Sequence, residues 1–149
     1  MANEEALAAL LDREAIRELP VRYCDHVWRN DVDGLIELFA DDGEFIIRTS
    51  EGDTAVAGRE ALVELYADGL ADAPRPYIHN HVVDLTSDST ASGRCYLDLR
   101  SAKHNMDWLG AGFYQDDYIK RNQSWLFQRR LFTVLRIDEW PGSVERPSR

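Results

Sequence analysis

Residues 107–137 read DWLGAGFYQDDYIKRNQSWLFQRRLFTVLRI, and the pattern within this stretch decides the fold. It predicts two long antiparallel β-strands that fold back on each other through the polar segment at residues 121–124. Because side chains alternate along a strand, one face of the first strand receives Gly112, Tyr114, Asp116 and Tyr118. The same alternation in the second strand places Arg129 beside Trp125 and Phe127, and Arg130 beside Phe132.

Aromatic and charged side chains therefore share both predicted faces of this hairpin. A strand with one face in water normally shows a clean apolar-in, polar-out alternation. The mixed faces favour a sheet that wraps around a partly polar pocket. We take that pocket as the predicted functional site.

The composition is that of one globular domain. The chain has 149 residues, enough to bury a substantial core, and its 30% of charged residues is ordinary for a water-soluble protein. A net charge of -10 argues against nucleic acid or an anionic membrane as a partner. Residues 1–5 lack the pattern of a secretory signal, and no apolar run approaches the roughly 20 residues of a membrane helix, so we expect a cytoplasmic protein. Cys24 and Cys95 are too isolated for a disulfide framework and are expected to be buried thiols.

Helical spacing dominates the first half of the chain. We expect one short helix after Asn3 and a second after Asp12, because both residues cap helix N-termini well. The buried stripe of the second helix is predicted to consist of Ile16, Leu19, Pro20, Tyr23 and Val27. A further helix is expected to end at Gly43, followed by a strand over residues 44–49 and a turn at residues 51–53. Another helix is expected over residues 59–70.

From Tyr77 to Ile137 the pattern is that of β-strands. One strand is expected over residues 77–84, with His79 and His81 on one face, and a second over residues 90–100. Helices that precede an antiparallel sheet in the sequence indicate the α+β class. We expect three to four helices packed on a strongly curved antiparallel sheet, which together form a cone-shaped barrel around a pocket. Residues 1–140 are expected to form the domain, and residues 141–149 a frayed tail.

Several local patterns resemble those of the nuclear-transport-factor-two-like superfamily, which includes ketosteroid isomerase, scytalone dehydratase and SnoaL-like cyclases. The patterns are AIR at residues 15–17, DGL at 33–35, LFADDG at 38–43, GREAL at 58–62 and GFYQD at 112–116. The resemblance covers nearly the whole chain and implies the cone-shaped α+β fold. The superfamily contains enzymes and binding modules alike, so its fold alone does not choose a reaction.

The resemblance also implies roles for two polar residues. Tyr23 matches the tyrosine with which ketosteroid isomerase holds a developing enolate oxygen, and Asp116 matches the protonated aspartic acid beside it. The catalytic base of that enzyme is not retained, because Ile47 stands at its position. Scytalone dehydratase has an aspartate where this chain has Trp28, and its strand histidine falls near residues 76–77.

His79 and His81 are the predicted proton-transfer groups, because imidazole is the side chain whose pKa lies nearest neutrality. The alternative is one pocket histidine and one structural histidine. The pair is also a weak metal motif, but no carboxylate or thiolate lies at matching spacing, so we expect no metal.

The remaining candidates have two interpretations each. Tyr23 is either an oxyanion donor or a buried tyrosine that caps a backbone carbonyl. Asp116 is either a neutral donor or the partner of Arg130 in an ion pair, and the ion pair is favoured. The ligand wall is predicted to include Trp28, Ile47, Tyr96, Tyr114 and Phe132, with ordinary core packing as the alternative.

These observations predict a cofactor-independent lyase or isomerase that acts on a small apolar ring compound carrying oxygen, such as a steroid, terpenoid or polyketide-like ring. Two alternatives stay open. One is a non-catalytic small-molecule-binding or assembly module. The other is an accessory β-type subunit of a ring-hydroxylating oxygenase. We expect a homodimer or homotrimer, because an open curved sheet leaves an apolar outer face.

Overall fold

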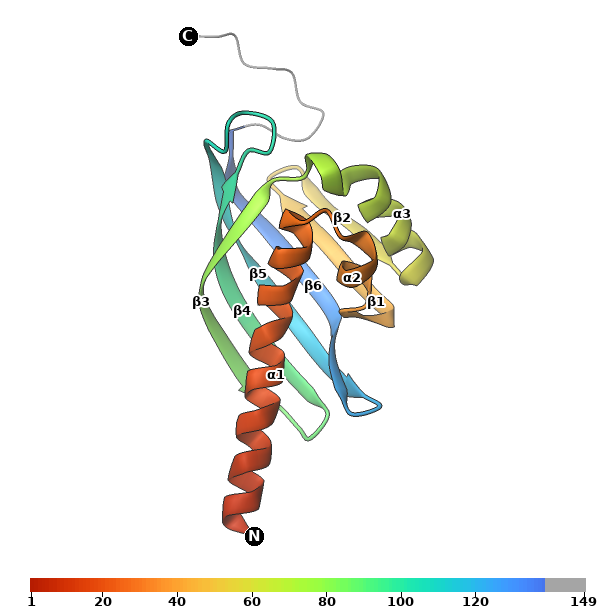
Figure 1. Ribbon diagram of the computed structural model, residues 1–149, viewed down its shortest axis with the longest axis vertical. Coiled ribbons are helices and arrows are strands. Elements are labelled where there is room, and N and C mark those ends of the chain that lie inside the picture. Colours follow the sequence, from red (N-terminus) through yellow and green to blue (C-terminus); the bar gives the residue numbers. More distant parts are fainter. Residues whose placement is uncertain (139–149) are drawn as a thin grey trace.

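The computed structural model describes residues 1–138. The elements, in chain order, are α1 (Ala2–Trp28), α2 (Val32–Ile36), β1 (Phe39–Thr49), β2 (Gly52–Ala57), α3 (Arg59–Gly69), the short 3-10 helix η1 (Leu70–Asp72), β3 (Arg75–Leu85), β4 (Thr90–Arg100), β5 (Trp108–Arg121) and β6 (Ser124–Ile137). All helices lie on one side of a curved six-stranded sheet (Figure 1). This arrangement confirms the predicted α+β class and the curved sheet.

The strand order in the sheet is β2-β1-β6-β5-β4-β3. Neighbouring strands are antiparallel except β1 and β6, which run parallel. Four strands, β2 to β5, lie between these two in the chain. The sheet is open, with β2 and β3 as its edges, so the predicted barrel is a cone that does not close on itself.

The hairpin predicted from residues 107–137 is confirmed and forms the centre of the sheet. Its turn contains Asn122 and Gln123, whose φ angles are 50° and 66°. Two successive residues with positive φ are typical of the tight turns whose twist matches that of the flanking strands. The hairpin occupies the middle of the sheet, and α1 contacts its strand β6 as well as the edge strand β3.

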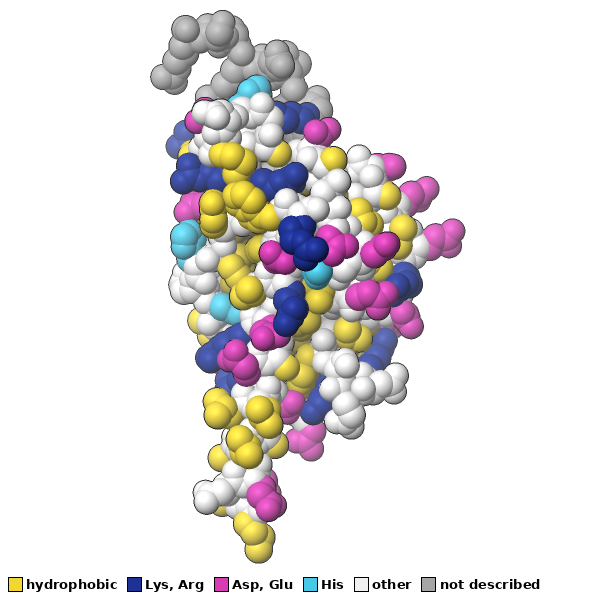
Figure 2. Space-filling model, in the orientation of Figure 1, with side chains coloured by type: hydrophobic (Ala, Val, Ile, Leu, Met, Phe, Trp, Pro, Cys, Tyr) yellow, Lys and Arg dark blue, Asp and Glu magenta, His cyan; other side chains and the backbone are white. Residues whose placement is uncertain are grey.

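The two helices expected at the N-terminus are one continuous helix, α1, of 27 residues. Asp12 does not cap a second helix, because its Oδ1 accepts hydrogen bonds from the Trp125 indole at 2.8 Å and from Lys120 at 3.0 Å. This carboxylate instead anchors the middle of α1 to β5 and β6. The turns that precede it reach beyond the sheet and expose the leucines Leu7, Leu10 and Leu11 (Figures 1 and 2).

The segment around residues 36–57 differs from the prediction in two ways. The helix that was expected to reach Gly43 ends at Ile36, because β1 begins at Phe39 and pairs with β6 there. The ring of Phe39 lies 5.3 Å from the ring of Phe127, which draws this segment into the sheet. Strand β2 was not predicted at all, since it is an edge strand whose side chains are mostly exposed and show no apolar alternation. The helix expected over residues 59–70 is confirmed as α3.

The core lies between the concave face of the sheet and the helices. The predicted stripe of α1 is confirmed: Ile16 is fully buried, and Leu19, Pro20, Tyr23 and Val27 are buried beside it. Cys24 and Cys95 are buried free thiols, as expected. No helix in residues 1–138 is both long and apolar enough to cross a membrane. The predicted tail at residues 141–149 lies outside the described residues.

Candidate functional site

A β-bulge in β3 separates the two histidines that the sequence placed together. Ile78 pairs with Leu97 and His81 pairs with Cys95, so two residues of β3 stand opposite one residue of β4. An extra residue reverses the in-and-out alternation beyond it. His79 therefore points to the convex side of the sheet and His81 to the concave side. The prediction that His79 and His81 share one face was wrong.

The two imidazoles have different surroundings. On the exposed side, Nε2 of His79 lies 2.8 Å from Oδ2 of Asp98, whose other oxygen accepts a hydrogen bond from the Trp108 indole. On the inner side, His81 is half-buried, and its Nε2 lies 3.1 Å from the hydroxyl of Tyr118. Burial, together with the nearby charges of Arg130 and Arg17, lowers the pKa of His81 to about 4. His81 is thus neutral at pH 7.

A second bulge, between β5 and β6, explains why both faces of the central hairpin looked mixed. Asp117 pairs with Arg129 and Tyr118 pairs with Phe127, so one extra residue in β6 reverses the alternation there. Trp125 and Phe127 before the bulge and Arg130 and Phe132 after it consequently share the concave face. Arg129 lies on the convex face. The concave face is largely apolar, with one charged pair set into it.

That charged pair is Arg130 and Asp116, which are 0% and 2% exposed. Arg130 donates from Nε to Oδ1 of Asp116 at 3.1 Å and from Nη2 to Oδ2 at 3.3 Å. The Tyr118 hydroxyl donates to the same carboxylate at 3.0 Å. The favoured ion-pair interpretation of Asp116 is therefore confirmed. Burial raises the pKa of Asp116, but the charge of Arg130 and these three hydrogen bonds favour its ionised form.

Arg130 also lies against three aromatic rings. Its guanidinium carbon is 3.5 Å from the ring centre of Tyr114, 4.3 Å from that of Tyr23 and 4.4 Å from that of Phe127. A cation over aromatic faces is stabilised electrostatically, and more so where water is excluded. Nη1 is a buried nitrogen without a hydrogen-bond partner among residues 1–138. These contacts fix the positions of the two tyrosine rings that face the cavity.

A cavity of about 280 Å³ lies between α1, α3, the segment after η1 and the sheet. The described residues that line it are mostly apolar: Tyr23, Val27, Phe45, Ile47, Leu65, Tyr66, Gly69, Leu70, Ala73, Pro74, Pro76, Leu99, Tyr114 and Phe132. None of them carries a charge. The cavity accordingly suits an apolar molecule.

Three phenols supply the polar groups of this lining. The hydroxyls of Tyr23 and Tyr66 are 2.9 Å apart and hydrogen-bonded to each other. Burial raises the pKa of Tyr23 to about 12, and burial also raises the pKa of Tyr66 and Tyr114. All three are therefore protonated hydrogen-bond donors at neutral pH. Tyr66 was not predicted as a site residue, although its helical spacing from Leu62 on α3 was a signal that it faces inward.

Four of the predicted site residues line the cavity: Tyr23, Ile47, Tyr114 and Phe132. Arg130 and Asp116 lie behind the rings of Tyr23 and Tyr114, and His81 is not among the lining residues. The predicted convergence of two histidines with Tyr23 in one hollow is therefore not found.

Trp28 and Tyr96, which were predicted to be part of the ligand wall, are not among the residues that line the cavity. Trp28 is 37% exposed, and its indole donates to the carbonyl of Pro76 while its ring lies 5.1 Å from that of Tyr77. Tyr96 is 39% exposed and contacts Phe113 on the convex face. Tyr96 faces outward because the strand β4 alternates regularly and its neighbours Cys95 and Leu97 occupy the concave side. Within residues 1–138 no three acidic, histidine or cysteine side chains are close enough to hold a metal ion.

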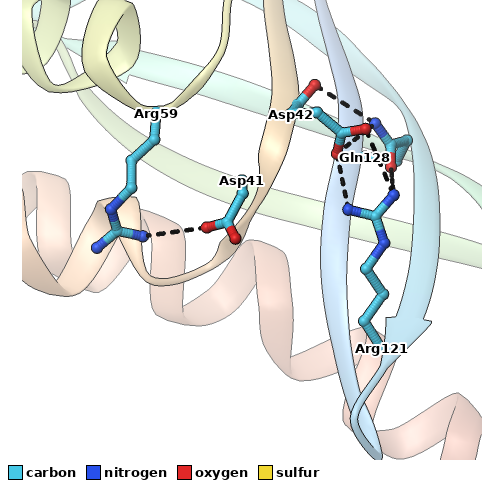
Figure 3. A network of polar contacts seen from close by, with 5 residues as sticks. All are labelled: Asp41, Asp42, Arg59, Arg121 and Gln128. Carbon is cyan, nitrogen blue, oxygen red and sulfur yellow. Dashed lines mark hydrogen bonds and ion pairs between the residues drawn. The ribbon is translucent and has the colours of Figure 1, made fainter.

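A separate polar network lies at the rim of the sheet, near the hairpin turn (Figure 3). Arg121 donates to Oδ1 of Asp42 at 2.7 Å and to the side-chain oxygen of Gln128 at 3.1 Å. Arg59 lies 3.9 Å from Asp41 in the same region. All of these charged side chains are well exposed, so the network joins β1 to the central hairpin without forming a cavity.

Comparisons with known proteins agree with this fold. The profile of the SnoaL-like domain family matches residues 8–131. An NTF2-like protein with a cystatin-like fold from Novosphingobium aromaticivorans is 25% identical, with a TM-score of 0.75 over 91% of this chain and 90% of that one. A scytalone dehydratase-like protein from the same organism is 23% identical, with a TM-score of 0.76 over 95% and 96%. A type 2 hexachlorocyclohexane dehydrochlorinase, LinA, is 20% identical, with a TM-score of 0.75 over 95% and 97%. No curated protein sequence matched.

Proposed function

Because the chain belongs to the SnoaL-like domain family, we propose that it is a cofactor-independent lyase or isomerase acting on a small apolar ring compound that carries an oxygen. The observation that carries this proposal is the hydrogen-bonded Tyr23–Tyr66 pair in the wall of an apolar cavity. Two of the structural neighbours are named for eliminations, a dehydration and a dehydrochlorination, which fits a lyase.

The phenol pair would stabilise negative charge on the ligand oxygen. One phenol donates to the other, and a hydroxyl that accepts a hydrogen bond at its oxygen is a stronger donor through its own proton. Preorganised donors in a cavity with little water stabilise a developing oxyanion far more than they would in bulk water. Arg130 lies 4.3 Å from the centre of the Tyr23 ring, but its charge is balanced by Asp116, so the phenols are the groups on which this stabilisation depends.

His81 is the proposed proton acceptor. Its imidazole is neutral at pH 7 because its pKa is about 4, within the range of carboxylates that serve as general bases in related chemistry. The hydroxyl of Tyr118 holds its Nε2 and links it to Asp116. Since His81 does not line the cavity, a proton leaving the ligand would have to reach it by way of an intervening water molecule.

A non-catalytic binding module is the second candidate. It is favoured by the lining itself, which includes no imidazole and no carboxylate among the residues described. A binder would use the same apolar walls and the same phenols to retain a ligand without removing a proton from it. The two candidates differ in chemistry, and a proton-exchange measurement separates them.

The test is exchange of the hydrogens next to the carbonyl of a small ring ketone in deuterated water, followed by NMR. The lyase or isomerase proposal expects exchange faster than in buffer, and a loss of about 10²-fold in Tyr23→Phe, because one oxyanion donor is removed. Tyr96→Phe is the matched control, since Tyr96 is on the convex face and should leave the rate unchanged. Binding of the ketone without accelerated exchange would select the binding module.

A homodimer or homotrimer is the proposed assembly. Tyr77, Tyr96 and Trp108 are 51%, 39% and 40% exposed, and all three project from β3, β4 or β5 on the outer side of the sheet. Covering such rings with a second copy would remove apolar surface from water. Light scattering on the purified chain measures the state, and a monomer at high concentration would contradict the proposal.

A further inference from the structure

We infer that the cavity selects an uncharged ring compound of about monoterpenoid size, with one or two hydrogen-bond-accepting oxygens, and excludes both steroids and carboxylates. The inference rests on the proposed function only in treating this cavity as the ligand site. It narrows the substrate class by three independent properties of the lining: its size, its charge and its supply of hydrogen-bond donors.

The size of the ligand is limited by the volume of the cavity, which is about 280 Å³. Small-molecule sites in proteins usually range from about 300 to 1,000 Å³, so this one lies at the small end. A ligand that fills this cavity is therefore smaller than a typical drug-sized molecule. A bicyclic monoterpenoid ketone fits that size. A steroid has roughly twice as many non-hydrogen atoms as that ketone and would extend beyond a cavity at the small end of the range.

The walls that limit the cavity come from separate elements of the fold. Phe45 and Ile47 lie on β1, Leu65 lies on α3, and Pro76 at the start of β3 pairs with Leu99 on β4. Each of these side chains belongs to a regular element that packs against a neighbour. Enlarging the space for a ligand would therefore require a change in the side chains that form the wall.

A charged ligand is excluded because none of the lining side chains provides an opposite charge. The buried charges beside the cavity belong to Arg130 and Asp116, which neutralise each other through two hydrogen bonds. A carboxylate that entered would lose its hydration without gaining an ionic partner, which is strongly unfavourable in an apolar environment. The preferred ligand is consequently neutral.

The number of oxygens follows from counting phenol protons. Tyr23 and Tyr66 have two hydroxyl protons between them, and one is used in their mutual hydrogen bond. The other proton of the pair is available to a ligand. The hydroxyl of Tyr114, which also belongs to the lining, has no hydrogen-bond partner among residues 1–138. The phenol pair and Tyr114 thus offer two donors, which suits a ligand with one or two acceptor oxygens.

Isothermal titration calorimetry with three probes tests the inference: camphor as a neutral bicyclic ketone, camphorcarboxylate as its charged analogue, and androstenedione as a steroid. We expect camphor to bind and both other probes to bind at least about tenfold more weakly. The carboxylate would find no opposite charge in the cavity, and the steroid would find too little space. Tyr114→Phe should weaken camphor binding about five- to tenfold through loss of one hydrogen bond, whereas the convex-face variant Tyr96→Phe should leave it unchanged.

A wall variant provides the independent check on size. Ile47→Ala enlarges the cavity and should improve the affinity of androstenedione relative to camphor, while Val82→Ala on the convex side should not. Steroid binding as tight as camphor binding in the unaltered protein, or tight binding of the carboxylate, would overturn the inference and leave the proposed reaction standing. Failure of all three probes to bind would also overturn it. Camphor binding without proton exchange would overturn the reaction and leave the inference standing.

Discussion

The concave side of the sheet, on the one hand, and its convex side and rim, on the other, carry the same residue types in opposite environments. An Arg–Asp pair, a histidine and a tyrosine occur on each: Arg130–Asp116, His81 and Tyr114 inside, and Arg121–Asp42 at the rim with His79 and Tyr96 outside. Inside, burial changes the pKa of the histidine and sets the tyrosine against a cation. Outside, the same side chains remain in contact with water. Environment, and not residue type, determines which of them can take part in chemistry.

The two ion pairs show the contrast most sharply. Arg130 and Asp116 have no access to water, so their charges depend wholly on each other and on the Tyr118 hydroxyl. Arg121 and Asp42 are exposed, so water replaces either partner when the other is removed. The predictions below use such inner and outer partners as matched pairs.

The largest effect is expected from breaking the inner ion pair. Arg130→Met should lower the free energy of unfolding by about 3–5 kcal/mol, because Asp116 is left as a buried charge without a partner. Arg121→Met, at the rim, should cause little change. Urea denaturation measures both variants.

Removing both inner charges checks the reason for this loss. Arg130→Met combined with Asp116→Leu should recover most of the stability, since no uncompensated charge remains in the core. Equal losses in Arg130→Met and Arg121→Met would contradict the contrast between the two sides of the sheet.

The second prediction compares the histidines in the proton-exchange assay. His81→Ala should reduce the exchange rate by about 10²-fold, as expected for loss of a general base. His79→Ala should stay within about twofold of the unaltered protein, because His79 contacts Asp98 on the exposed side. A larger loss in His79→Ala than in His81→Ala would place the proton acceptor on the convex side of the sheet and contradict this prediction.

The third prediction concerns stability and pH. His81 takes up a proton near pH 6.5 in the unfolded chain but only near pH 4 in the folded one. Between these values the unfolded state binds more protons, so this residue reduces stability as the pH falls from about 6.5 to about 4. His81→Gln should flatten that part of the stability profile, measured by urea denaturation at each pH. An unchanged profile would show that the imidazole is not held in its neutral form.

The smallest effect is expected at the rim. A double-mutant cycle on Arg121 and Asp42 should give a weak coupling that disappears as salt is added, because both side chains are exposed. The lowered pKa of Asp42, which comes chiefly from its hydrogen bond with Arg121, should rise toward its ordinary value in Arg121→Met. NMR titration of the carboxylate checks this. A coupling that persists in high salt would mean that the rim pair is more shielded than its exposure indicates.

The sequence predicted those parts of the fold that have a strong period. The central hairpin, the buried stripe of α1 and helix α3 all follow from apolar spacing, and so does the inward position of Tyr114. The bulges in β3 and near Gln128 in β6 were not predicted, because the sequence does not show where a strand pairs irregularly, and the extra residue reverses the alternation of the side chains beyond it. The errors for His79 and for the mixed faces of β6 share this cause. The joining of two predicted helices at Asp12 depends on Lys120 and Trp125, which lie more than a hundred residues away.

The strand order has a consequence for how the chain is made. The strands at and near the edges of the sheet, β1 to β4, leave the ribosome first, whereas the central pair, β5 and β6, leaves last. Until β6 emerges, β1 has only the exposed strand β2 as a neighbour, and Tyr23 on α1 lacks its contacts with Phe127 and Arg130. A nascent chain released before residue 137 would thus expose both and be a target for chaperones and proteases. The chain can therefore complete its native sheet only when translation is nearly finished.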